Sequence, residues 1–305
     1  MAEPVLAVTR LAGTAGDAAL LVVGPSLGTA VAALWEDCAA RVGGTDPAAA
    51  PPGGGSGTGH PGGYQVIGWD LPGHGASPPA TASFTVAELA AAVQAVATAA
   101  AAGRPACYAG VSLGGTVAYA IAPEPGPFLA AAAIASASSI GDPPQWKDRA
   151  ETVRKAGTAA IVPASAGRWF APGFTERDPG TAGRLLQTLA DADDESYALA
   201  CEALAGFDRR RDLGRMRIPF LLGPGEHDGV VPPARTRQDA AAMPGSQLEV
   251  FAGCGHLPPA EDPAAVAAEL AAFFAARAAP GPDGSSPGRP PGFPPAPTRP
   301  RTEET

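Results

Sequence analysis

The stretch Gly110-Val111-Ser112-Leu113-Gly114 lies between a strand-like run at 106–109 and a helix-like run at 116–120. A G-x-S-x-G sequence in this setting is typical of a nucleophile elbow, a sharp turn that exposes a serine hydroxyl. Such a turn strains the backbone of the serine, and its two glycines leave space where a Cβ would meet neighbouring chain. The pattern therefore predicts that Ser112 is a nucleophile at the end of a buried strand.

Short apolar runs on both sides of this turn predict further buried strands, because each run ends at Gly, Pro or Asp. Helical patterns lie between most of the runs. A capping box at 85–88 begins one helix, and Asp262-Pro263 places Pro at the first position of the last helix. The alternation predicts an α/β fold with a mostly parallel central sheet and helices on both faces. The predicted strands are 20–23, 64–69, 106–111, 129–134, 219–222 and 247–251.

The alternation of strands and helices breaks after Asp142, and only helical spacing is visible up to Arg217. We interpret residues 143–217 as a helical cap inserted into an α/β core that consists of 1–142 and 218–278. The Gly- and Pro-rich stretch near 43–63 is expected to be a mobile surface loop. Residues 279–305 have too little apolar surface to fold, and we expect a disordered tail or a linker.

A serine hydroxyl needs a base that takes its proton. Of the four histidines, His256 follows a predicted strand, on the side of the sheet where α/β proteins bind ligands. We therefore predict His256 as the base. His60 lies in the Gly-rich loop, His74 in a tight turn, and His227 directly before an aspartate.

The base needs an acid that fixes its tautomer and stabilises its positive charge. Asp228 follows the strand at 219–222 and gives the chain order Ser, Asp, His. It is the predicted third member of the triad, with Glu226 and Asp142 as rivals.

A tetrahedral intermediate also needs two backbone N–H donors. Leu113 directly follows the nucleophile and should supply one. The second should come from the turn after the strand at 20–23, where Pro25 has no N–H. Ser26 is the predicted donor there, and Leu27 is the alternative.

Composition and charge narrow the class of protein. A net charge of −9 argues against a nucleic-acid partner. Neither a membrane span nor a secretory signal is visible, and the four cysteines have no C-x-x-C spacing. The histidines lack the spacing of metal ligands. We expect a cytoplasmic protein with reduced thiols, no membrane partner, no metal ion and no organic cofactor.

Several longer stretches carry a resemblance to a known family, over about residues 5–278. The chain resembles the 3-oxoadipate enol-lactone hydrolases of the α/β-hydrolase superfamily. DxxGxGxS and GxSxGG are common in the superfamily, whereas the RWF element and the CxAL…FD pattern are narrower. The chain is also similar to bifunctional proteins in which the lactonase precedes a 4-carboxymuconolactone decarboxylase. The stretches are SLGT (26–29), GWDLPGHGAS (68–77), AGVSLGGTVAYAIA (109–122), GRWFAPGF (167–174), SYALACEALAGFDRR (196–210) and LLGPGEHDGVVPPA (221–234).

The resemblance implies an activity: hydrolysis of 3-oxoadipate enol-lactone to 3-oxoadipate in the β-ketoadipate pathway of aromatic catabolism. A Ser-His-Asp triad would act through an acyl-enzyme. The substrate would be a small anionic lactone, with Arg168 as the carboxylate ligand and Trp169 as an apolar wall. Trp146, together with Arg149 and Arg154, is a weaker candidate for contact with the substrate.

Other functions fit the same scaffold. The alternatives are a general carboxylesterase, a cofactor-free perhydrolase or haloperoxidase, and a non-catalytic small-molecule receptor with a hydrolase fold. A further hypothesis makes the chain one module of a fusion or association with a carboxymuconolactone decarboxylase.

Overall fold

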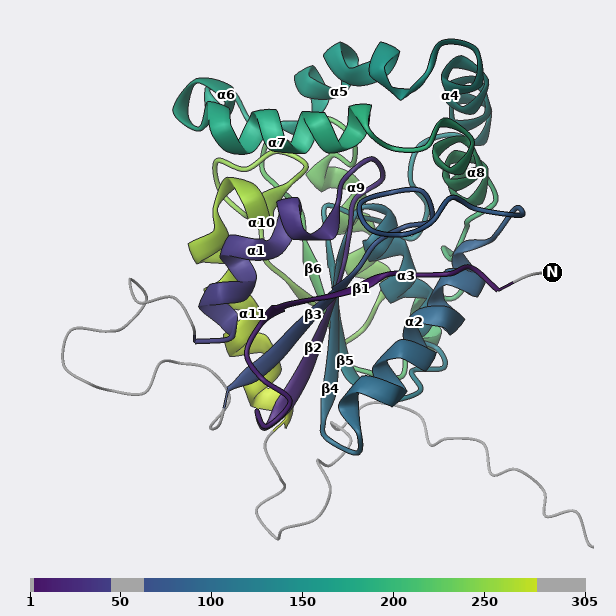
Figure 1. Cartoon of the computed structure of the whole chain (residues 1–305). Coiled ribbons are helices and arrows are strands. Elements are labelled where there is room, and N and C mark those ends of the chain that lie inside the picture. Colours follow the sequence, from purple (N-terminus) through teal and green to yellow (C-terminus); the bar gives the residue numbers. More distant parts are fainter. Residues whose placement is uncertain (1–2, 45–62, 279–305) are drawn as a thin grey trace, which may run out of the picture.

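A computed structural model describes residues 3–44 and 63–278 of the chain. Its centre is a seven-stranded sheet with the order β1-β3-β2-β4-β5-β6-β7 (Figure 1). All neighbouring strands are parallel except β1 and β3, which are antiparallel. The α/β fold with a mostly parallel sheet is therefore confirmed. The strands are β1 (Val8–Ala12), β2 (Ala19–Gly24), β3 (Tyr64–Trp69), β4 (Ala106–Val111), β5 (Phe128–Ile134), β6 (Phe220–Gly223) and β7 (Gln247–Leu248).

The sequence prediction of the strands was wrong at the two edges of the sheet. Strand β1 was not predicted, because its outer residues stay exposed and it lacks a continuous apolar run. Strand β7 is shorter than predicted, and the chain beyond it meets the sheet again only where Phe251 bridges Gly225. The central strands β2, β4 and β6 are buried along their whole length, which explains why their apolar runs were easy to recognise.

Helices cover both faces of the sheet. Helix α1 packs against α11, and α2 packs against α3, on opposite sides of the strands (Figure 1). The predicted capping box is present at the start of α2, where Thr85 and Glu88 bond to each other's backbone N–H. The helices of the core, outside the segment between β5 and β6, are α1 (Val31–Val42), α2 (Val86–Ala101), α3 (Leu113–Ile121), α9 (Pro233–Ala242), α10 (Pro258–Glu261) and α11 (Pro263–Ala278).

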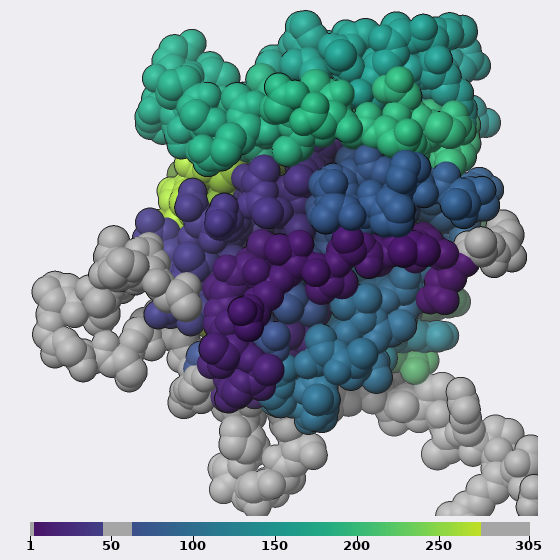
Figure 2. Space-filling model, viewed as in Figure 1, coloured from purple at the N-terminus to yellow at the C-terminus, as the bar shows by residue number. Residues whose placement is uncertain are grey.

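A second group of helices lies between β5 and β6 in the chain and spans one end of the sheet (Figure 1). Figure 2 shows it as a separate layer above the rest of the molecule. We call this layer the cap. Its helices are α4 (Pro143–Ala156), α5 (Val162–Trp169), α6 (Phe174–Arg177), α7 (Pro179–Ala190) and α8 (Asp194–Ala205), with 3-10 turns at Thr158–Ile161 and Leu213–Arg215.

Most of the Gly- and Pro-rich loop, including His60, and the whole predicted tail at 279–305 lie outside the described residues. Within the described residues, no helix combines the length and the apolar character that crossing a membrane requires.

Candidate active site

Ser112 lies in the sharp turn between β4 and α3. Its φ of 54° and ψ of −111° are unusual for a residue with a Cβ. The turn is also crowded, since a Cβ on Gly110 would lie 2.2 Å from the carbonyl oxygen of Gly114. A Cβ on Gly114 would in turn lie 2.6 Å from the Pro25 oxygen. Only glycine fits these two positions, and the strand-turn-helix geometry is that of a nucleophile elbow.

His256 and Asp228 form a buried hydrogen-bonded pair. The Nδ1 atom of His256 is 2.9 Å and 3.0 Å from the two carboxylate oxygens of Asp228. The same carboxylate accepts hydrogen bonds from the backbone N–H groups of Val230 (2.7 Å) and Val231 (2.8 Å). These donors fix the carboxylate, which in turn holds the Nδ1–H tautomer of His256 and leaves Nε2 as the basic nitrogen.

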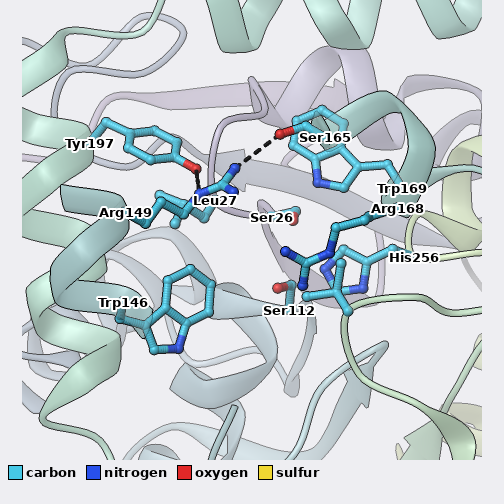
Figure 3. A pocket seen from close by; sticks show the side chains of 11 residues that line it. Ser26, Leu27, Ser112, Trp146, Arg149, Ser165, Arg168, Trp169, Tyr197 and His256 are labelled. Atoms are coloured by element: carbon cyan, nitrogen blue, oxygen red, sulfur yellow. Dashed lines mark hydrogen bonds between the residues drawn. The ribbon is translucent and has the colours of Figure 1, made fainter. Parts of the chain in front are cut away.

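Ser112 and His256 line one pocket between the sheet and the cap (Figure 3). Loops that follow β2, β4, β6 and β7 supply one wall, and cap helices α4, α5 and α8 supply the other. Among the described residues that line the pocket, none is acidic. They are Ser26, Leu27, Ser112, Trp146, Arg149, Ser165, Arg168, Trp169, Tyr197, Val230 and His256.

The turn after β2 decides which N–H groups could stabilise an oxyanion. The Ser26 N–H donates to Thr29 Oγ1 at 3.1 Å, so it is already used within the turn. Among the described residues, the N–H groups of Leu27 and Leu113 have no protein acceptor. The geometry therefore favours Leu27, the alternative to Ser26, as the partner of Leu113. Ser26 still lines the pocket with its Oγ, which is buried and has no hydrogen-bond partner in the described part of the chain.

The cap places all three sequence-predicted substrate residues at the pocket. Trp169 is buried, and Trp146 is half-buried with its indole N–H donating to the Ile140 oxygen at 2.6 Å. Arg168 lines the pocket and extends toward Ser112, but it is exposed to solvent (Figure 3).

Of the two arginines that were weaker candidates for contact with the substrate, only one lies at the pocket. Arg149 lines the pocket, half-buried, and donates to Tyr197 Oη at 2.8 Å and to Ser165 Oγ at 2.9 Å. Arg154 lies outside it and pairs with Glu195 and Glu202. Sequence reasoning gave no role to Tyr197 or Ser165. Tyr197 lies within the family-like stretch 196–210, whereas none of the quoted stretches contains Ser165.

The rival acids and bases lie elsewhere. Glu226 is exposed and accepts from the Gly253 N–H, and Asp142 is exposed at the start of α4. His227 is also exposed, whereas His74 is buried with Nδ1 donating to the Pro72 oxygen at 2.9 Å. Among the described residues, no cluster of His, Cys, Asp and Glu side chains could hold a metal ion.

Comparison with known proteins places this geometry in a family. Residues 56–269 match the Alpha/beta hydrolase family. The chain is 34% identical to 3-oxoadipate enol-lactonase 2 of Acinetobacter baylyi over 203 residues, which are 66% of this chain and 75% of the relative. The chain belongs to the Alpha/beta hydrolase family.

Solved structures agree with this assignment. The enol-lactonase from Burkholderia xenovorans LB400 has a TM-score of 0.77 and 25% identity, over 88% of this chain and 96% of that chain. A hydrolase from Pseudomonas aeruginosa PA01 has a TM-score of 0.73 and 26% identity, over 88% of this chain and 94% of that chain. The comparisons therefore confirm the predicted resemblance to enol-lactone hydrolases.

Proposed function

We propose that this chain hydrolyses 3-oxoadipate enol-lactone to 3-oxoadipate, with Ser112 as the nucleophile, His256 as the base and Asp228 as its partner. The observation that carries the proposal is the buried His256–Asp228 pair, whose imidazole lines the same pocket as a strained Ser112. The similarity to two enol-lactonases supports the substrate. The two arginines of the pocket support an anionic ligand, against the overall charge of −9.

The first half of the reaction opens the lactone ring. The Ser112 oxygen adds to the lactone carbonyl carbon while its proton passes to Nε2 of His256. The carbonyl oxygen becomes an oxyanion, to which the N–H groups of Leu27 and Leu113 donate. Collapse of this intermediate breaks the bond from the carbonyl carbon to the ring oxygen. The departing oxygen takes the proton from His256 as an enol, which then tautomerises to the ketone.

The second half releases the product. His256 removes a proton from a water molecule, and the resulting hydroxide adds to the acyl carbon. Collapse breaks the ester bond to Ser112, and the proton on His256 returns to the serine oxygen. One water is consumed, and the product carries a new carboxylate. Asp228 stays ionised throughout and stabilises the imidazolium.

A spectrophotometric assay tests this function. The purified chain should consume 3-oxoadipate enol-lactone with a kcat/KM at least about a hundredfold above that for a neutral short-chain ester such as p-nitrophenyl acetate. Preference for the neutral ester would favour a general carboxylesterase. Failure to consume either compound, with no reaction of Ser112 toward a fluorophosphonate, would favour a non-catalytic receptor.

A further inference from the structure

One corner of the pocket is built by three cap helices that each contribute one side chain. Arg149 from α4 donates through Nε to Tyr197 Oη of α8 and through Nη2 to Ser165 Oγ of α5. All three side chains line the pocket that contains Ser112 (Figure 3). We call these three residues the Arg149 cluster.

The positive charge of the Arg149 cluster has no counter-ion in the described part of the chain. Both partners of Arg149 are hydroxyl groups, and burial raises the pKa of Tyr197 further, so that this hydroxyl stays neutral. Arg154 on the same helix differs, because it pairs with Glu195 at 2.7 Å and with Glu202 at 2.6 Å. A half-buried cation without a counter-ion is costly, and an anionic ligand would remove that cost.

The Arg149 cluster also has hydrogen-bond donors left for a ligand. A guanidinium carries five N–H groups, and the two contacts to Tyr197 and Ser165 use two of them. Each hydroxyl accepts from Arg149, so its own proton remains free to donate elsewhere. Several donors that converge on one point match the acceptor oxygens of a carboxylate.

We propose that the Arg149 cluster is the subsite that binds the carboxylate of the substrate and selects carboxylate-bearing enol lactones over neutral ones. This assignment rests on the proposed function for the identity of the reacting group. Arg149 is held in place by two hydrogen bonds, whereas Arg168 is exposed and its attraction is screened by solvent. Arg168, which lines the pocket but is exposed, then attracts the incoming anion, and Arg149 anchors it.

Two enol lactones that differ in the carboxylate group test the subsite: 3-oxoadipate enol-lactone, and the neutral analogue with methyl in place of carboxymethyl. Arg149→Gln should lower kcat/KM for the anionic lactone roughly ten- to a hundredfold and that for the neutral lactone less than about threefold. Arg168→Gln should give a smaller loss that fades in high salt. Lys155→Gln removes an exposed charge from the same helix and should change neither value. An equal loss on both lactones in Arg149→Gln would make Arg149 a structural support and overturn the assignment.

A binding measurement separates this subsite from the catalytic proposal. Hexanoate and hexanamide have the same shape and differ in charge, and Trp146 and Trp169 can report their binding by fluorescence. The wild-type chain should bind hexanoate at least about tenfold more tightly than hexanamide, and Arg149→Gln should lose that preference. If this pattern holds without lactone turnover, the subsite stands and the proposed function fails. An unchanged preference in Arg149→Gln would reject the subsite whatever the activity.

Discussion

At the residue scale, the sequence marks the proposed nucleophile more clearly than the proposed carboxylate subsite. The nucleophile elbow is a local motif, so the position of Ser112 followed from five residues and their flanks. The proposed carboxylate subsite depends instead on how separate helices meet. The sequence favoured Arg168 over Arg149, because the RWF element is conspicuous, but Arg149 gains its partners from α5 and α8 through tertiary packing. No periodicity within α4 could have shown those contacts.

The strained backbone of Ser112 leads to a stability prediction for a matched pair of variants. Ser112→Gly and Ser112→Ala should both lose lactone turnover and keep the fold. Because glycine adopts the combination of φ 54° and ψ −111° at a lower cost than alanine, the glycine variant should have the larger free energy of unfolding, by about 1 kcal/mol. Urea unfolding measures this difference. A glycine variant no more stable than the alanine variant would show that the turn stores no strain.

At the element scale, the loop that carries His256 is held between the core and the cap. The His256 N–H donates to the Trp169 oxygen at 2.7 Å. The buried carboxylate of Glu261 accepts from the N–H groups of Gly255 and Leu257, on both sides of the histidine, and of Ala171 in the cap. Burial raises the pKa of Glu261, while the three N–H groups oppose that rise. The sequence could place His256 after a strand, but not this clamp, which joins residues 90 positions apart.

Removal of the Glu261 carboxylate should make the position of His256, the proposed base, less well fixed. Glu261→Ala would leave three buried N–H groups without their acceptor, so we expect a loss of about 3 kcal/mol in the free energy of unfolding. The kcat for the lactone should fall more than KM rises, because Glu261 positions His256 and is absent from the substrate pocket. Glu261→Gln keeps one acceptor oxygen and should recover part of both losses.

Glu249→Ala, at an exposed position, is the control for Glu261 and should change neither stability nor kcat. If Glu261→Ala were as active and as stable as the wild type, the hydrogen bonds of Glu261 would not be what positions His256.

At the scale of the whole molecule, the cap contributes a locally positive site to a protein with a negative net charge. The chain carries a net charge of −9, yet the pocket under the cap contains Arg149 and Arg168 with no acid among its described lining residues. Figure 2 shows the cap as one continuous layer over the core. The sequence predicted that these helices cover one end of the sheet. It did not show which of their side chains turn inward, because that depends on how the helices pack on each other.

Global stability should depend on the protonation of His74. Burial lowers the pKa of His74 to about 4, from its ordinary value near 6.5. Between these values the unfolded chain binds a proton that the folded chain excludes, so stability falls as pH drops, by up to about 1.4 kcal/mol per pH unit. Burial raises the pKa of Asp70 and Glu261, which acts in the opposite direction.

The difference between the wild-type chain and His74→Gln isolates the histidine. Urea unfolding from pH 7 to pH 4 should show that the variant loses less stability than the wild type, by about 3 kcal/mol at the lower limit. Parallel curves for the two proteins would mean that His74 is not held neutral in the fold.

The most direct measurement is rapid-quench peptide mass spectrometry of the chain during turnover of 3-oxoadipate enol-lactone. The peptide that contains Ser112 should gain the mass of one whole lactone, because ring opening retains every atom in the acyl-enzyme. Ser112→Gly should show no adduct and no turnover. Steady consumption of the lactone with Ser112 unmodified, or with the adduct on another residue, would contradict covalent catalysis by this serine.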